Sequence, residues 1–234
     1  MHEHVHGKTF YPNVTRNYED TPYPMPSNIK HIVFDFGGVI INLTTNNAAT
    51  SFRKFLSDNT THSITADDEK AVDALNLCYE IGGMSHEQFR NNMQRTLGIS
   101  VAADLFDHAW NSIIADLPKQ RISLLHHLRE QYHLSLLSNT NAGHLAYINR
   151  LMQTEHGTHC LDDLFDRVYY SHLVGMRKPS PEIFTHVLSD SGITAAETLF
   201  IDDLAANTTA AAALGIQTLH LIGQDICEAL AKYI

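Results

Sequence analysis

The stretch HIVFDFGGVI, residues 31–40, decides how the rest of the chain is interpreted. Its apolar run from Ile32 to Phe34 is typical of a fully buried strand. The carboxylate of Asp35 follows at once, and two glycines then allow a sharp turn and a close approach of the backbone to a ligand. Because open α/β sheets bind ligands beyond the carboxyl ends of their strands, Asp35 is a candidate for chemistry. The alternative is a strand-ending aspartate that caps the next element.

Composition and charge exclude several classes of protein. The 234 residues carry a formal net charge of −10, with 44% apolar and 18% charged residues, a balance that allows a sizeable core. No basic stripe is present, so a nucleic-acid partner is not expected. No apolar run reaches membrane-spanning length, and the N-terminus lacks the apolar segment of a signal peptide. Cys78, Cys160 and Cys227 are widely spaced, which is typical of reduced thiols, so we expect a cytoplasmic protein.

The chain begins with an arm and continues with a helical insertion. Residues 1–27 are polar, with prolines at positions 12, 22, 24 and 26 that prevent helices and discourage strand pairing, so we expect a surface arm. Residues 44–116 have apolar positions at helical spacing, and Thr65 with Asp68 is typical of a capping box, as is Ser85 with Gln88. Four helices are predicted there, whereas a simple crossover between two parallel strands usually needs one. We interpret this segment as an inserted subdomain.

The remaining segments, 28–43 and 117–234, predict the core. Buried strands are expected at residues 134–137, 168–171, 199–201 and 216–222, separated by helical patterns. Repeated strand–helix units indicate a doubly wound parallel sheet with right-handed crossovers, and therefore an α/β protein.

Polar side chains follow each of the first four predicted strands. Asp35 follows the first, Ser138 the second, Lys178 lies just past the third, and Asp202 and Asp203 follow the fourth. In a parallel sheet these ends meet at one edge, where three carboxylates would repel one another without a cation. Carboxylates suit Mg²⁺, whereas lysine and hydroxyl donors suit an anion such as phosphate. An aspartate nucleophile divides a phosphoryl transfer into two steps through an aspartyl-phosphate.

The order of these motifs resembles the haloacid dehalogenase superfamily of hydrolases. The matching stretches are residues 35–39, 138–139, 178–179 and 202–203, and the helical insertion resembles the cap domain of that family. Residues 137–141 and 175–179 further resemble the branch that contains bacterial α-glucose-1-phosphatases and the phosphatase domain of soluble epoxide hydrolases. The resemblance covers about residues 29–234 and implies a Rossmann-like core with a cap.

The resemblance implies roles for the acidic residues. Asp35 would be the nucleophile, and Mg²⁺ would be bound by Asp35, the carbonyl group of Gly37 and Asp202, with Asp203 as a further ligand or support. Asn207 lies one helical turn after Asp203 and would orient that carboxylate. An ordinary residue on the helix surface is the alternative for Asn207.

The resemblance also implies residues that bind the substrate. Ser138, Asn139 and Lys178 would bind the transferring phosphoryl group, and Gly38 would lie against the substrate. Helix capping is the alternative for Ser138 and Asn139. In the cap, Glu80 is a candidate ligand for sugar hydroxyl groups, the alternative being a solvated carboxylate at a helix end.

One position departs from the family pattern. Phosphatases of this family usually carry a second aspartate two residues after the nucleophile, as general acid and base, and Gly37 stands there instead. We expect a Mg²⁺-dependent phosphatase of a small metabolite, with a preference for sugar-1-phosphates because their leaving oxygen needs less protonation. A metal-independent 2-haloacid dehalogenase and a non-catalytic phosphate-binding regulatory module are the alternatives.

Overall fold

Five parallel strands form the sheet at the centre of the protein. The computed structural model describes residues 28–44, 48–60 and 63–231, so the predicted arm at residues 1–27 lies outside the described residues. The strands lie in the order β3-β2-β1-β4-β5, and every neighbouring pair is parallel. Their bounds are β1 His31–Phe34, β2 His133–Ser138, β3 Arg167–Tyr170, β4 Thr198–Asp202 and β5 Gln217–His220. The predicted α/β class is confirmed, although β5 is shorter than the predicted strand.

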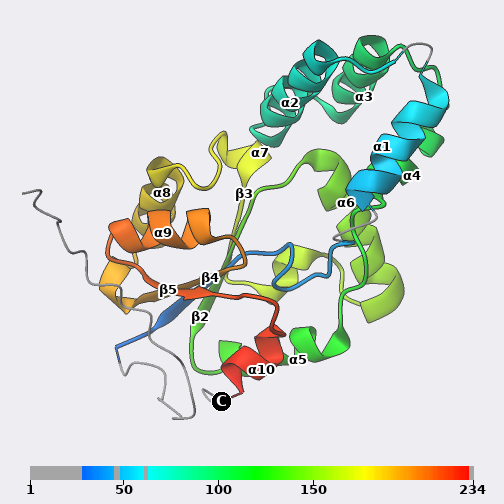
Figure 1. Ribbon diagram of the computed structural model, residues 1–234. Coiled ribbons are helices and arrows are strands. Elements are labelled where there is room, and N and C mark those ends of the chain that lie inside the picture. The colour runs from blue at the N-terminus through cyan, green and yellow to red at the C-terminus, as the bar shows by residue number, and fades with distance from the viewer. Residues whose placement is uncertain (1–27, 45–47, 61–62, 232–234) are drawn as a thin grey trace, which may run out of the picture.

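Helices cover both faces of the sheet (Figure 1). Successive side chains of a strand point to opposite faces, so Ile32 and Phe34 pack in one apolar cluster and Val33 in another. The first cluster includes residues of α5 (Lys119–Arg129), α6 (Ala142–Leu151) and α10 (Ile226–Leu230). The second includes residues of α8 (Pro181–Ser191) and α9 (Ala205–Ala213). Shorter elements connect them: η1 Met152–His156, η2 Leu161–Leu164, α7 Ser171–Val174 and η3 Ala195–Glu197.

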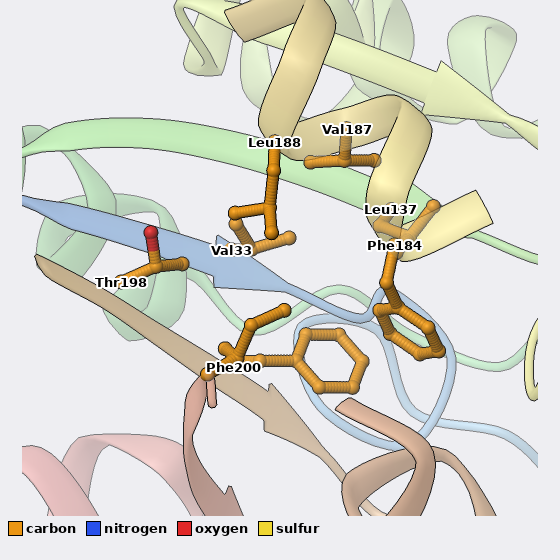
Figure 2. A pocket seen from close by; sticks show the side chains of 8 residues that line it. Val33, Leu137, Phe184, Val187, Leu188, Thr198 and Phe200 are labelled. Atoms are coloured by element: carbon orange, nitrogen blue, oxygen red, sulfur yellow. The ribbon is translucent and has the colours of Figure 1, made fainter. Parts of the chain in front are cut away.

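A small void under α8 belongs to the packed core. Figure 2 shows Val33, Leu137 and Phe200 of the sheet facing Phe184 and Val187 of α8. The void has a volume of about 10 Å³, no more than a single water molecule needs, and its walls are apolar. It is therefore a packing feature and not a ligand site.

Five helices lie between β1 and β2 among the described residues, and the first four of them form the cap above the sheet (Figure 1). These four are α1 Ala48–Asn59, α2 Ala66–Glu80, α3 His86–Leu97 and α4 Ala103–Asn111. Both predicted capping boxes are present, at Thr65 before α2 and at Ser85 before α3. Aromatic and aliphatic side chains, among them Phe89 and Phe106, give the cap its own apolar cluster. Within the described residues, no helix combines the length and the apolar character required to cross a membrane.

Candidate active site

Asp35 lies directly beyond the carboxyl end of β1, in the centre of the sheet. Its backbone N–H continues the ladder by donating to the carbonyl group of Ile201 at 2.8 Å, so the residue is fixed by the neighbouring strand. The side chain is buried, and its Oδ1 accepts a hydrogen bond from the backbone N–H of Phe36 at 2.7 Å. Burial raises the pKa of the Asp35 carboxyl, Lys178 opposes this shift, Asp202 adds to it, and the resulting value is about 6.

Lys178 joins the two central carboxylates. Its Nζ lies 2.7 Å from Oδ1 of Asp35 and 2.7 Å from Oδ2 of Asp202. The lysine side chain is 1% exposed, and its ammonium group lies 5.4 Å from the centre of the Phe200 ring. A buried ammonium group needs partners of opposite charge, and these two carboxylates supply them. The predicted meeting of the polar groups at one sheet edge is therefore seen in the structure.

Asn207 fixes Asp202 rather than Asp203. Its side-chain amide donates to both carboxylate oxygens of Asp202, at 2.9 and 3.0 Å, and the backbone N–H of Leu204 donates to Oδ1 at 2.8 Å. The prediction that Asn207 orients Asp203 is wrong. Asp202 is the last residue of β4 and is fully buried, whereas Asp203 lies after the strand and is partly exposed, so the first turn of α9 places Asn207 against Asp202.

Asp203 completes a group of three carboxylates. One oxygen each of Asp35, Asp202 and Asp203 lies within 4.8 Å of the others. Gly38 has a φ of 75°, and a Cβ atom there would overlap Oδ2 of Asp203, so glycine is required for this approach. When all four groups are ionised, three negative charges face the single positive charge of Lys178. Oxygen ligands and an excess negative charge are what Mg²⁺ needs, and the residues therefore fit this ion.

The residues after β2 position the lysine. Asn139 accepts a hydrogen bond from the backbone N–H of Lys178 through Oδ1 and donates to the carbonyl group of Lys178 through Nδ2, both at 2.9 Å. The amide side chain thus holds the lysine backbone, and a direct contact of Asn139 with a phosphoryl group stays a prediction. Ser138 is buried at the end of β2, two residues beyond Leu136, which pairs with Phe34 of β1. Asn141, not Ser138 or Asn139, caps α6 by accepting from the backbone N–H of His144.

Glu80 reaches the core from the end of α2. Its Oε2 lies 3.1 Å from Nη2 of Arg177, the residue before Lys178. Burial raises the pKa of Glu80, and the Arg177 guanidinium opposes this shift. Arg177 was not predicted as a site residue, because no spacing rule in the sequence links a residue at the end of a cap helix to a loop of the core. Its charge and its place beside Lys178 were the available signals.

Leu43 occupies the space beside Gly37. A Cβ atom at Gly37 would lie 3.1 Å from Cδ1 of Leu43. The backbone of Gly37 does not have the left-handed conformation seen at Gly38. An aspartate at position 37 is therefore compatible with the backbone and is opposed by one leucine side chain. Gly38 donates its backbone N–H to the carbonyl group of Ile41, so its predicted contact with substrate stays a prediction.

A curated protein with an assigned activity is similar along most of the chain. D-ribitol-5-phosphate phosphatase from Bacteroides thetaiotaomicron is 32% identical over 193 residues, which cover 82% of this chain and 91% of the relative. This likeness agrees with the phosphatase predicted from the motifs. The narrower likeness to α-glucose-1-phosphatases stays a prediction.

Solved structures of the haloacid dehalogenase family are also similar to this chain. A haloacid dehalogenase family enzyme from Bacteroides thetaiotaomicron, solved with magnesium and inorganic phosphate, is 34% identical, covers 86% of this chain and 98% of its own, and has a TM-score of 0.75. A predicted hydrolase of the same family from Porphyromonas gingivalis is 32% identical, covers 88% and 98%, and has a TM-score of 0.76. The model of the haloacid dehalogenase-like hydrolases matches residues 29–215. The chain belongs to the haloacid dehalogenase-like hydrolase family.

Proposed function

We propose that this hydrolase is a Mg²⁺-dependent phosphatase of a small phosphorylated metabolite, and that the leaving group is a sugar or a polyol. The observation that carries the proposal is the contact of one buried ammonium group with two carboxylates, at 2.7 Å each, beside a third carboxylate. The relative that hydrolyses D-ribitol-5-phosphate and the related structure solved with magnesium and phosphate support the same chemistry.

The residues divide the reaction into two steps. An oxygen of Asp35 attacks phosphorus, the bond from phosphorus to the ester oxygen breaks, and the leaving oxygen takes up a proton. Water then attacks the aspartyl-phosphate, which releases inorganic phosphate and restores Asp35. Lys178 and the hydroxyl group of Ser138 donate to the phosphoryl oxygens. Mg²⁺, held by Asp35, Asp202, Asp203 and the Gly37 carbonyl group, would neutralise the charge of the transferring group.

The leaving group is proposed on the basis of Gly37. Without a carboxyl group there, the barrier depends more steeply on how well the leaving oxygen bears negative charge. The anomeric oxygen of a sugar-1-phosphate bears it better than a primary alcohol does. Sugar-1-phosphates are thus our proposed preference, although the D-ribitol-5-phosphate phosphatase takes the phosphate ester of a primary alcohol.

The test is a panel of phosphate esters assayed with Mg²⁺ and with excess chelator. It contains glucose-1-phosphate, glucose-6-phosphate and D-ribitol-5-phosphate. We expect turnover only with Mg²⁺, and a kcat/KM for glucose-1-phosphate about tenfold above that for glucose-6-phosphate, near 1.4 kcal/mol in transition-state free energy. Equal or reversed values contradict the proposed preference and indicate another proton donor. No turnover of any ester contradicts the phosphatase, and hydrolysis of 2-haloacids in chelator supports a dehalogenase instead.

A further inference from the structure

The backbone of Arg177 is held beside the phosphate-binding lysine. Asn139 bonds both the N–H and the carbonyl group of Lys178, and Lys178 is fixed in turn by two buried carboxylates. The side chain of Arg177 therefore leaves the backbone one residue before Lys178, which is predicted to bind the phosphoryl group. It ends against the cap, where Nη2 lies 3.1 Å from Glu80.

The arginine has a buried donor that no group of the described residues satisfies. Nε of Arg177 is shielded from solvent but has no hydrogen-bond partner, while the side chain as a whole is 40% exposed. Leaving such a donor unpaired is costly, so native proteins rarely keep one without a reason. Because the side chain as a whole is partly exposed, it can turn Nε toward a ligand, and an acceptor supplied by that ligand removes this cost.

The turn after Glu80 lies against the core and fixes where the carboxylate is presented. Gly82 has a φ of 76°, and a Cβ atom there would overlap the carbonyl oxygen of His172 in α7. Figure 1 shows the end of α2 beside α7, on the route from β3 to Lys178. Glu80 and Arg177 are therefore a polar pair that spans the junction of cap and core on the side of the lysine.

Resting on the proposed function, we propose that Arg177 and Glu80 together select a neutral, polyhydroxylated leaving group. A hydroxyl group can accept from the Arg177 Nε–H and donate to the Glu80 carboxylate at once, and it is the group that sugars and polyols carry in number. A carboxylate or second phosphate on the leaving group is repelled by Glu80, and an apolar group leaves the Nε donor unpaired. The pair thus discriminates against both anionic and apolar phosphate esters.

Three substrates separate these classes: D-ribitol-5-phosphate, butyl phosphate and 3-phosphoglycerate. In Arg177→Lys, which keeps a positive charge opposite Glu80 but removes Nε, the ratio of kcat/KM for ribitol phosphate to that for butyl phosphate falls about tenfold or more. Arg177→Met gives at least the same fall. In Glu80→Gln, kcat/KM for 3-phosphoglycerate relative to ribitol phosphate rises about tenfold.

Arg167→Met is the matched control, because it removes another arginine–carboxylate pair, with Asp190, at the start of β3. It leaves both ratios unchanged. An unchanged ratio of ribitol phosphate to butyl phosphate in Arg177→Lys overturns the inference, since the pair then only holds the cap against the core. Equal losses on both substrates in Arg177→Met overturn it in the same way. Turnover of any of the three esters by the wild type with Mg²⁺ supports the proposed phosphatase activity, whether or not the inference about Arg177 and Glu80 holds.

Discussion

At the scale of single residues, Asp35 is the most direct test of the chemistry. Asp35→Asn keeps the volume and the acceptor for the Phe36 N–H but removes the attacking charge. We expect kcat to fall about a thousandfold or more, equivalent to about 4 kcal/mol in the barrier. The melting temperature should not fall, because the change removes the cost of burying this charge and its repulsion with Asp202, which together outweigh the lost ion pair with Lys178 and keep the pKa of Asp35 raised. A variant that keeps more than about a tenth of wild-type kcat contradicts a nucleophilic role.

Gly37 and Leu43 give a second prediction at this scale. Gly37→Asp brings a carboxyl group toward the leaving oxygen but crowds Leu43, whose Cδ1 lies 3.1 Å from the new Cβ position. We expect the double variant Gly37→Asp/Leu43→Ala to raise kcat/KM for glucose-6-phosphate relative to glucose-1-phosphate about tenfold, because general acid catalysis contributes about 10²–10⁴-fold. Leu43→Ala alone is the control and should leave the ratio unchanged. No change in the double variant indicates that protonation of the leaving group does not limit the reaction.

At the scale of elements, α2 of the cap is bonded to α6 of the core through one hydroxyl group. Tyr79 is buried, accepts from the backbone N–H of Gly143 at 2.7 Å, and lies 2.7 Å from Nδ1 of His86. Tyr79→Phe leaves the Gly143 donor without its acceptor and should lower the free energy of unfolding by about 1–3 kcal/mol. Chemical denaturation measures this loss. Tyr147→Phe on α6 is the control, because its hydroxyl group has no hydrogen bond among the described residues, and an equal loss there contradicts the argument.

His144 makes the same junction sensitive to pH. Its ring stacks on Trp110, and its Nδ1 lies 3.0 Å from Oδ1 of Asn111, whose amide already donates to a backbone carbonyl. Nδ1 of His144 therefore carries the proton that Oδ1 of Asn111 accepts, and the ring is neutral at pH 7 because its pKa is lowered. Burial, with a smaller effect of His86, lowers the pKa of His144 from 6.5 to about 4.

The sign of the pH effect follows from this lowered pKa. Below pH 6.5 the unfolded chain binds a proton at His144 that the folded protein does not bind until about pH 4. The neutral ring makes its full contribution to the free energy of unfolding above pH 6.5. About 3 kcal/mol of that free energy is lost as the pH falls to about 4. Because other groups titrate in this range, the measurement is the difference between wild type and His144→Gln in unfolding free energy against pH. His126→Gln, at an exposed position, should show no such difference.

The sequence was informative about elements and less so about contacts between them. The strands were predictable because short apolar runs end in polar residues, and both capping boxes because they depend on residues three positions apart. The contacts of Asn207 with Asp202 and of Glu80 with Arg177 depend instead on how separate elements pack. Helical spacing wrongly favoured Asp203 for Asn207, because it takes no account of where β4 ends and α9 begins.

At the scale of the whole molecule, the charge at the sheet edge couples metal binding to stability. Asp35 belongs to one segment and the adjacent Asp202 and Asp203 to another, the two segments meet only in the folded protein, and Lys178 offsets one of the three charges. An ion that binds the folded state alone stabilises it, by about 2.7 kcal/mol at a concentration one hundred times its Kd. We therefore expect Mg²⁺ to raise the melting temperature of chelator-treated protein in a concentration-dependent way.

Two matched variants test whether the increase in melting temperature arises from Mg²⁺ bound by these three carboxylates. Asp203→Asn weakens the site while keeping the buried contacts of Asp202 with Lys178 and Asn207, so the rise in melting temperature should need more Mg²⁺. Asp116→Asn removes an exposed carboxylate at the end of the cap segment and should respond like the wild type. Equal responses in all three proteins indicate that Mg²⁺ acts on the general negative charge of the molecule. A response lost only in Asp203→Asn places the ion between the ends of β1 and β4, where the attacking oxygen of Asp35 would need it.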